Sequence, residues 1–264
     1  MKRLLIVIPI TTLLLTSCFK NKYKKDPTAK DIATIESYFD DLKSISDDAS
    51  DGSMEVYKSA TKDNCATITI DTNGNSTAIE VDYGTTNCNC LDGKDRRGKV
   101  VITYNGNYRD SGTVISITPV NYFVNEHELS GSHIVTNEGT NSSGNTWYTI
   151  DVDGTMTTPD GETVTYVSDR IREWVEGEST IWNIFDDVYE ITGTATGTNS
   201  EGTGYTMEVL TPLNVKIGCG YVRSGVLEII PTSFETITVD FGNGDCDANF
   251  TYEIDGNVYE VNYN

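Results

Sequence analysis

Three side chains within one short stretch combine positive charge with an aromatic ring, and this combination can bind sugars or acidic ligands. Arg170, Arg172 and Trp174 occupy alternate positions, and Trp147 and Trp182 flank them in sequence. Alternate residues of a strand share a face, so we expect the three side chains to lie together. Guanidinium groups recognise carboxylates and stack on rings. The commoner use, which we favour, is pairing with carboxylates across the solvent-facing side of a sheet.

The two histidines, His127 and His133, do not form a metal motif. On one strand their offset of six would place them on the same face but roughly 20 Å apart, at ~3.3 Å per residue. Neither His-Glu-x-x-His nor the Gly-x-Ser-x-Gly elbow occurs. The sequence therefore predicts no zinc site, no cofactor and no catalytic residue.

Carboxylates are too abundant to identify a site by themselves. With 40 Asp and Glu residues, pairs suited to glycoside hydrolysis could be assembled almost anywhere. Residues 71–75 have the 1-3-5 oxygen spacing of a calcium loop, but Ser76 and Asp82 stand where glycine and glutamate are required. We interpret residues 71–75 as a turn between strands.

The N-terminus has the form of an export signal. Lys2 and Arg3 precede an apolar run over residues 4–15, which has the size of a signal peptide and is shorter than the ~20 residues of a spanning helix. The run ends Leu-Thr-Ser-Cys18 and resembles the lipobox of bacterial lipoproteins. The resemblance implies removal of residues 1–17 and acylation of Cys18. The alternative is an ordinary secretory peptide with a chance cysteine.

Residues 18–27 then form a tether rich in lysine. The lysines, beside a lipid anchor, can rest on anionic headgroups, at ~1 kcal/mol per charge, or simply be solvated. Phe19 stands where an aspartate retains enteric lipoproteins in the inner membrane. By that resemblance we expect the outer membrane, on its periplasmic face or its surface.

Beyond the anchor, cysteines stand at positions 65, 88, 90, 219 and 246. Residues 81–88 and 239–246 both read Val-Asp-aromatic-Gly, three residues, Cys. In both copies another cysteine precedes a strand, a turn and a second strand. Because an exported protein meets an oxidising compartment, we predict disulfides Cys65–Cys88 and Cys219–Cys246, each stabilising by ~2–4 kcal/mol. Cys90 is the odd thiol; a reactive or metal role for Cys88 and Cys90 is the alternative.

The charge of the chain excludes one class of partner. Its 264 residues carry a formal net charge of −21. A field of that sign repels phosphate backbones, so we expect no nucleic-acid partner.

One amphipathic helix is predicted over residues 28–47. Thr28 to Asp31 suit a helix N-terminus, and an apolar stripe follows at helical spacing: Ile32, Ile35, Phe39, Leu42 and Ile45. Such a stripe more often packs against its own sheet than against a foreign partner.

From residue 54 the apolar residues alternate with polar ones, which indicates antiparallel strands with one wet face. Strands are expected around residues 67–70, 78–81, 100–104, 113–117, 162–167, 189–192, 205–209, 226–229, 236–239, 250–254 and 258–261. Turn dipeptides separate them, among them Asp92-Gly93, Asp153-Gly154 and Asp255-Gly256. We therefore predict an all-β fold in which residues 28–264 form one domain. Its strands form a single large antiparallel meander, either a sandwich or a curled sheet, and the helix precedes them.

Several segments together resemble uncharacterised β-rich lipoproteins of Bacteroidota-type bacteria. They are residues 92–106, 108–112, 121–125 and 170–174. The resemblance implies an envelope location and carries no known activity. The acidic surface-export tag of some such lipoproteins is replaced here by lysines.

The leading hypothesis is a non-enzymatic, lipid-anchored lipoprotein with a structural or binding role in the envelope, its partner a glycan or an envelope protein. A helix over a curled sheet also resembles periplasmic lipoproteins that handle lipids, so a carrier of lipids or amphiphiles is an alternative that requires an apolar cavity under the helix. A carbohydrate-binding module or glycan hydrolase is the third.

Overall fold

The computed structural model describes residues 26–50, 65–73, 76–106, 110–180, 183–219, 221–247 and 249–262. The predictions on residues 1–17, Cys18 and Trp182 lie outside this part of the chain. The elements are α1 (Thr28–Ser50), β1 (Thr67–Asn73), β2 (Ser76–Asp82), β3 (Cys88–Asn89), β4 (Asp95–Tyr104), β5 (Val114–Val124), β6 (His127–Thr140), β7 (Thr146–Thr157), β8 (Thr163–Glu176), η2 (Ile184–Asp186), β9 (Val188–Thr198), β10 (Gly204–Lys216), β11 (Ser224–Pro231), β12 (Ile237–Asn243), β13 (Asn249–Ile254) and β14 (Asn257–Asn262).

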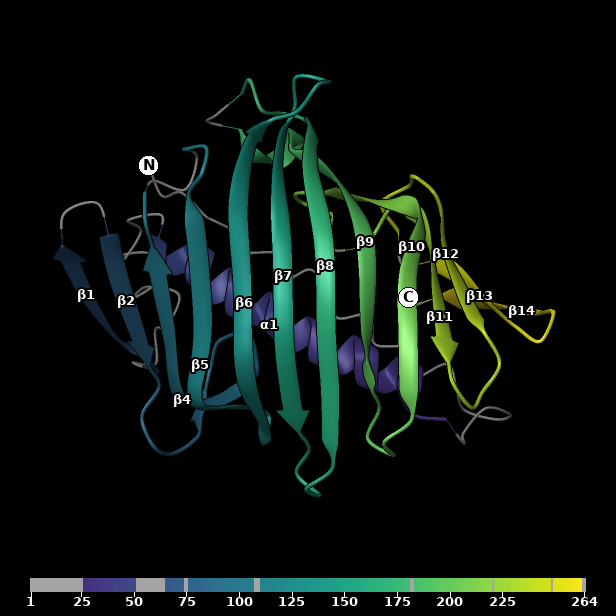
Figure 1. Cartoon of the computed structure of the whole chain (residues 1–264), viewed down its shortest axis with the longest axis horizontal. Helices are drawn as coiled ribbons and strands as arrows, with labels where there is room; N and C mark the ends of the chain where they lie inside the picture. Colours follow the sequence, from purple (N-terminus) through teal and green to yellow (C-terminus); the bar gives the residue numbers. More distant parts are fainter. Residues whose placement is uncertain are drawn as a thin grey trace.

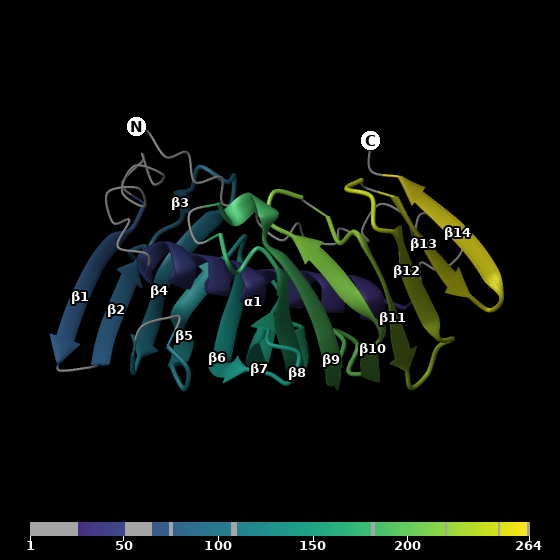
Figure 2. The same cartoon turned by 90° about the horizontal axis from the view of Figure 1, so that it is seen from above.

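The strands form one 14-stranded antiparallel sheet in chain order, with β3 paired to β4 beside the main path. The predicted antiparallel meander is confirmed. Of the two forms that we considered, the sandwich is wrong, because every strand joins a single sheet that curls without closing (Figures 1 and 2). A trough results, with β1 and β14 at its open edges.

The predicted strands all exist, but the sequence prediction missed β6 and β7 at the centre of the sheet. These strands are long, 14 and 12 residues. In β6 the buried Leu129 and Val135 stand six residues apart among Ser, Thr, Asn and Gly, so no alternation is visible. In β7 apolar residues do alternate from Tyr148 to Met156, but Asp153-Gly154 within it was interpreted as a turn.

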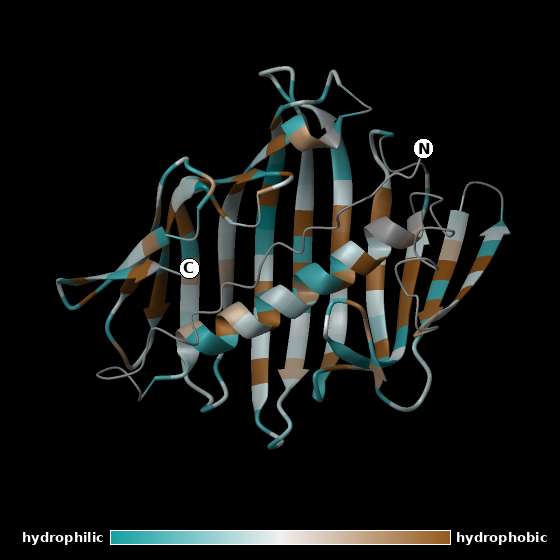
Figure 3. Ribbon diagram, turned by 180° about the vertical axis from the view of Figure 1, so that it is seen from behind, coloured by the Kyte–Doolittle hydropathy of each residue, from teal (hydrophilic) through white to brown (hydrophobic). Residues whose placement is uncertain are grey.

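Helix α1 lies across the concave face of the sheet and buries the predicted stripe. Ile32, Ile35, Phe39, Leu42 and Ile45 are each at most 5% exposed, and α1 contacts β5, β6, β7 and β8. Figure 3 shows the helix in the trough from behind. The stripe thus packs on its own sheet, as predicted, and the helix runs to Ser50 instead of residue 47. Among the described residues no helix is long and apolar enough to span a membrane.

The N-terminus of α1 is capped differently from our prediction. Asp26 Oδ1 accepts a hydrogen bond from the Thr28 amide at 2.8 Å, and Pro27 directly precedes the first helical residue. The expected capping residues face the β9–β10 turn instead. Thr28 Oγ1 accepts from Asn199 Nδ2 at 2.9 Å, and Asp31 accepts from the Ser200 amide at 2.8 Å. These contacts fix the start of the helix to the sheet.

The predicted turn at Asp153-Gly154 is wrong, since both residues lie inside β7. Gly154 is there to make room for the helix. A Cβ atom at this position would lie 2.3 Å from Cζ of Phe39. The ring of Phe39 therefore rests directly on the β7 backbone.

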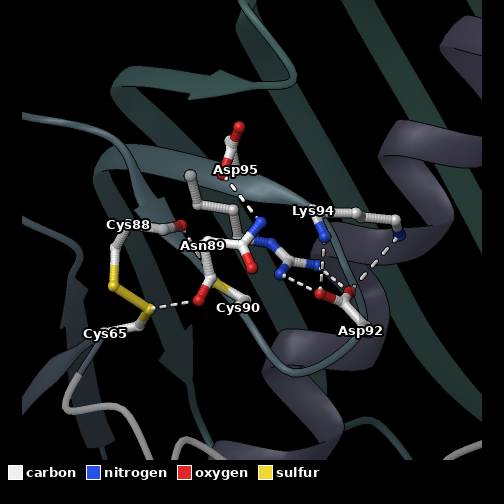
Figure 4. The surroundings of a disulfide bond; sticks show 8 residues. Cys65, Cys88, Asn89, Cys90, Asp92, Lys94 and Asp95 are labelled. Carbon is white, nitrogen blue, oxygen red and sulfur yellow. Dashed lines mark hydrogen bonds and ion pairs between the residues drawn. A yellow bond between two sulfur atoms is a disulfide. The ribbon is translucent and has the colours of Figure 1, made fainter.

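The structure joins Cys65 to Cys88 and Cys219 to Cys246, the two pairs that we predicted. Figure 4 shows the first bridge, beside which Cys90 remains a buried free thiol. Burial raises the pKa of the Cys90 thiol, which favours its unreactive protonated form. The first bridge ties the start of β1 to β3, and the second closes the segment that contains β11 and β12.

Candidate functional site

A cavity of about 200 Å³ lies between α1 and the sheet. The helix contributes one wall, from Ala29 to Lys43, and a rim is formed by residues 216–219 together with Tyr221 and Val222. The opposite wall is apolar and comes from β7 and β9 to β12, including Ile150, Ile191, Met207, Leu213, Leu227 and Val239. This is the apolar space under the helix that a carrier of amphiphiles requires.

The helix wall of the cavity includes two small side chains, Ala29 and Ala33. Further along the helix the Phe39 ring, which also lines the cavity, fills the space over β7. An engineered cavity of about 150 Å³ accepts benzene. The volume here is therefore sufficient for an aromatic ring or a short alkyl segment.

A polar border separates this apolar wall from the middle of the helix. Arg170 Nη2 of β8 donates to Glu36 Oε1 of α1 at 3.0 Å, and the Tyr166 hydroxyl donates to the same oxygen at 3.0 Å. Arg170 is buried, while about a third of the Glu36 side chain is exposed. Burial, first, and the Glu36 charge, second, raise the pKa of Tyr166.

The predicted face of Arg170, Arg172 and Trp174 exists, but the prediction placed it wrongly in solvent. All three side chains turn to the concave side, where Arg170 is 8% and Trp174 5% exposed. Arg170 pairs with Glu36 of the helix and not with a carboxylate of a neighbouring strand, which was the favoured expectation for it. The guanidinium of Arg172 lies over the rings of Tyr148 and Tyr189, at 4.8 and 5.1 Å from their centroids.

Arg170 and Arg172 line the cavity, and Trp174 packs beside Tyr189 at 5.5 Å between ring centroids. The sequence analysis missed four further charged lining residues, the acids Glu36 and Asp40 and the lysines Lys43 and Lys216. Glu36 and Asp40 stand four residues apart on α1, and hence on one helix face, a spacing that could have marked them as partners for arginines.

The Asp40 carboxyl is the most perturbed acid of this site. Although it is only half-buried by area, removal from water by the surrounding protein raises its pKa to about 7. The nearby Glu36 charge adds to the increase, and Arg170, Lys43 and Arg172 oppose it. The net rise shows that desolvation outweighs the attraction of the cations. Near neutral pH, Asp40 can therefore exchange a proton.

The charge of the cavity has the opposite sign to that of the chain. Its lining includes four basic residues, Lys43, Arg170, Arg172 and Lys216, and two acidic ones, Glu36 and Asp40. The chain carries 19 basic and 40 acidic residues. An anion that is repelled by most of the molecule is attracted here.

A second helix–arginine contact joins α1 to β4. Asp41 of α1 accepts hydrogen bonds from Nη2 of Arg96 at 2.8 Å and from Nζ of Lys94 at 2.7 Å. Nη1 of Arg96 also donates to Asp92 at 2.8 Å. Asp92 and Lys94 are drawn in Figure 4. Desolvation raises the pKa of Asp92, but its bonds with Arg96 outweigh that and hold it below the usual range.

The histidines support the helix and do not meet at one site. His127 Nδ1 lies 3.5 Å from the Tyr38 hydroxyl, and His133 Nδ1 lies 3.1 Å from the Phe39 carbonyl oxygen. In the described part of the chain, no group of three His, Cys, Asp or Glu side chains is placed to hold a metal ion. Of the calcium-like run, residues 71–73 belong to β1 and pair with β2, and residues 74 and 75 lie outside the described ranges.

Comparisons of the chain with protein-family models, with curated proteins and with solved structures found no match. The case for function therefore depends on the cavity and its polar border.

Proposed function

We propose that this chain is an exported, lipid-anchored binding protein that holds a small amphiphile in the cavity between α1 and the sheet. The observation that carries the proposal is the cavity itself, with an apolar wall from β7 and β9 to β12 and a charged border at Glu36 and Arg170. Binding sites for small molecules combine these two features: apolar surface supplies affinity, and a few polar groups orient the ligand.

The size of the cavity limits what it can hold. Sites for drug-sized ligands have ~300–1,000 Å³, and this one has about 200 Å³. A whole phospholipid cannot fit. The ligand is a molecule with one ring or a short alkyl chain, or a longer one whose remainder extends past the rim.

The proposed address is the outer membrane of a bacterial envelope. Its support is the lipobox ending at Cys18 together with two disulfides, which are typical of extracytoplasmic compartments. Between Cys18 and Thr28 the chain can extend at most ~35 Å, at ~3.5 Å per residue. The anchor would therefore keep α1, and the cavity beneath it, close to the membrane surface.

The geometry does not favour a glycan platform on the predicted arginine–tryptophan face. A sugar stacks on an exposed ring, and Trp174 is 5% exposed beneath the rest of the protein. We therefore propose binding of an amphiphile in place of binding of a glycan.

Calorimetric titration with 1-octanol, a neutral probe, tests the binding function. Ala33→Phe places a ring in the cavity from the helix side, and Leu213→Trp fills it from the sheet side. Each is expected to weaken octanol binding at least about tenfold, the equivalent of ~1.4 kcal/mol. Val167→Phe is the control, since Val167 is 45% exposed on the other face of β8. Equal binding by the filled variants and the control would exclude the cavity as the site.

The anchor is tested separately by metabolic labelling with radioactive palmitate. The wild-type chain is expected to incorporate the label and to sediment with outer membranes. Cys18→Ala should abolish both, because no other residue replaces the acylated thiol. Label in the Cys18→Ala variant, or none in the wild type, would contradict the proposed anchor without bearing on the cavity.

A further inference from the structure

We propose that the ligand carries an anionic oxyacid head group, a carboxylate or a phosphate, that binds beside Arg170 at the polar border while its apolar part lies against β10 to β12. The inference rests on the proposed function, since it names the class of amphiphile for the same cavity.

The first observation is an unused donor on a buried cation. Nη2 of Arg170 serves Glu36 and approaches the Tyr166 hydroxyl, at 3.0 and 3.5 Å respectively. Nη1 of the same guanidinium is buried and has no hydrogen-bond partner among the described residues. A buried donor without a partner costs about 1–3 kcal/mol. An oxyanion seated at Nη1 would remove this cost and complete the planar fork of the guanidinium.

Two hydroxyl groups of the lining stand in the same condition. Ser37 of α1 and Ser168 of β8 are 7% and 3% exposed, line the cavity, and have Oγ atoms without partners in the described part of the chain. Ser168 lies between Tyr166 and Arg170 on the same face of β8. Hydroxyl donors beside a guanidinium are groups that complete the shell of a carboxylate or phosphate.

The third observation is the sign of the charge. Four basic and two acidic side chains line the cavity of a chain with net charge −21. A cationic ligand would face Arg170 and Lys43 in low dielectric and be repelled, and a neutral one would offer Nη1 only an uncharged acceptor, which forms a weaker hydrogen bond than an oxyanion. An anion meets neither cost.

Glu36 is the natural competitor of such a ligand. Its carboxylate already occupies one side of Arg170, and its side chain is 35% exposed, so it can turn towards water when an anion arrives. Replacing Glu36 by glutamine keeps the shape of the side chain and removes the competing charge. Its effect on affinity therefore has the opposite sign to that of removing Arg170.

A series of octyl compounds with different head groups tests the inference by calorimetry on the wild-type protein. We expect octanoate or octyl phosphate to bind at least about tenfold more tightly than 1-octanol, and octyltrimethylammonium more weakly than 1-octanol. The ratio of octanoate to octyl phosphate affinity distinguishes a carboxylate from a phosphate ligand.

Three variants locate the head group. Arg170→Met is expected to bring the ratio of octanoate to 1-octanol affinity down to about one, because the cation that favours the anion is gone. Glu36→Gln, which leaves all cations in place, is expected to increase that preference severalfold. Lys99→Met is the matched control for lost positive charge, because Lys99 pairs with Glu80 and Asp82 on β2 and does not line the cavity; it should leave the preference unchanged.

The outcomes separate the two proposals. If no octyl compound binds, the proposed function fails. If all bind equally, or if Arg170→Met and Glu36→Gln leave the anion preference unchanged, the cavity binds apolar groups but the head-group inference is wrong. Because Glu36→Gln retains Arg170, its effect on the anion preference tests the inference even if Arg170→Met does not fold.

Discussion

Two contacts between α1 and an arginine of the sheet, Asp41–Arg96 and Glu36–Arg170, use the same kinds of residue for different purposes. Near the C-terminal half of α1, Asp41 meets Arg96, and nearer the N-terminus Glu36 meets Arg170. The first arginine also binds Asp92 and is surrounded by bonded partners. The second has a buried Nη1 atom without a partner in the described residues, and a cavity beside it.

The comparison shows that an arginine under a helix can use its donors on protein carboxylates or can keep one donor available for a ligand. We call Asp41–Arg96 the closed pair and Glu36–Arg170 the open pair. At Arg96 two carboxylates at short distances offset the cost of removing the charges from water. At Arg170 one partly exposed carboxylate does so incompletely. We interpret the first pair as the contact that holds α1 on the sheet and the second as the edge of a binding site.

Breaking the closed pair should have the largest effect on stability. Arg96→Met leaves Asp41 buried with only Lys94 near it, so we expect a loss of ~3–5 kcal/mol in the free energy of unfolding. At the open pair, Glu36–Arg170, Glu36→Gln removes the charge of a partly solvated side chain and keeps an oxygen that can accept from Arg170, so it should cost at most ~1 kcal/mol. Urea unfolding at pH 7 measures both. Equal losses would remove the distinction between the two pairs.

Removing either disulfide tests whether the first strands and the last strands of the sheet are stabilised alike. Double Cys→Ser replacement at Cys65 and Cys88, or at Cys219 and Cys246, should cost ~2–4 kcal/mol, since their loops have similar lengths. Cys219 lines the cavity and Cys65 does not. Only the second replacement should therefore also weaken octanol binding. A loss of binding with the first alone would place the ligand at the wrong end of the trough.

Asp40, near the Glu36–Arg170 pair, should make the free energy of unfolding depend on pH. Its pKa in the folded protein is about 7, against roughly 4 in an unfolded chain. The folded state therefore holds the proton more tightly, and the free energy of unfolding falls as pH rises from about 4 to 7. Asp40→Asn removes this penalty.

The free energy of unfolding of Asp40→Asn, relative to that of the wild type, should be ~1–3 kcal/mol higher at pH 8 than at pH 5. Urea unfolding at both pH values measures the difference. Asp41→Asn is the comparison at the Asp41–Arg96 pair, where the same change should destabilise the protein at pH 8. A pH-independent difference between Asp40→Asn and the wild type would contradict the raised pKa.

Gly154, which faces Phe39 between the two ion pairs, offers a smaller test of how α1 packs on the sheet. Gly154→Ala would place Cβ against the Phe39 ring, and such overpacking costs ~1–3 kcal/mol. Phe39→Leu on its own should also destabilise. Combined with Gly154→Ala it should cost less than the sum of the two, because the smaller side chain makes room for the methyl group. Strict additivity in thermal unfolding would show that the helix is not seated on β7 at this point.

The sequence predicted features that depend on local patterns. The stripe from Ile32 to Ile45, the strands with regular alternation and the repeated cysteine spacing were all interpreted correctly. Asp153-Gly154 was misinterpreted, since a glycine required by a helix distant in sequence looks the same as a turn glycine. The Thr28 to Asp31 segment was likewise interpreted as a local cap, although its side chains contact the β9–β10 turn.

The site itself was only partly predictable. Alternation placed Arg170, Arg172 and Trp174 on one face, but which face α1 covers depends on the curl of the whole sheet. Glu36 and Asp40 gained meaning only when the helix was placed over β8. The cavity lies between α1 and strands more than a hundred residues away in the sequence, and no local pattern predicts that these segments meet.

The most direct test is a crystal structure of the protein soaked with 8-bromooctanoate, located by the anomalous scattering of bromine. We predict a bromine peak between α1 and β10 to β12, with the carboxylate beside Nη1 of Arg170. A cavity that stays empty in fully occupied crystals, or bromine found only on the outer surface of the sheet, would contradict the account.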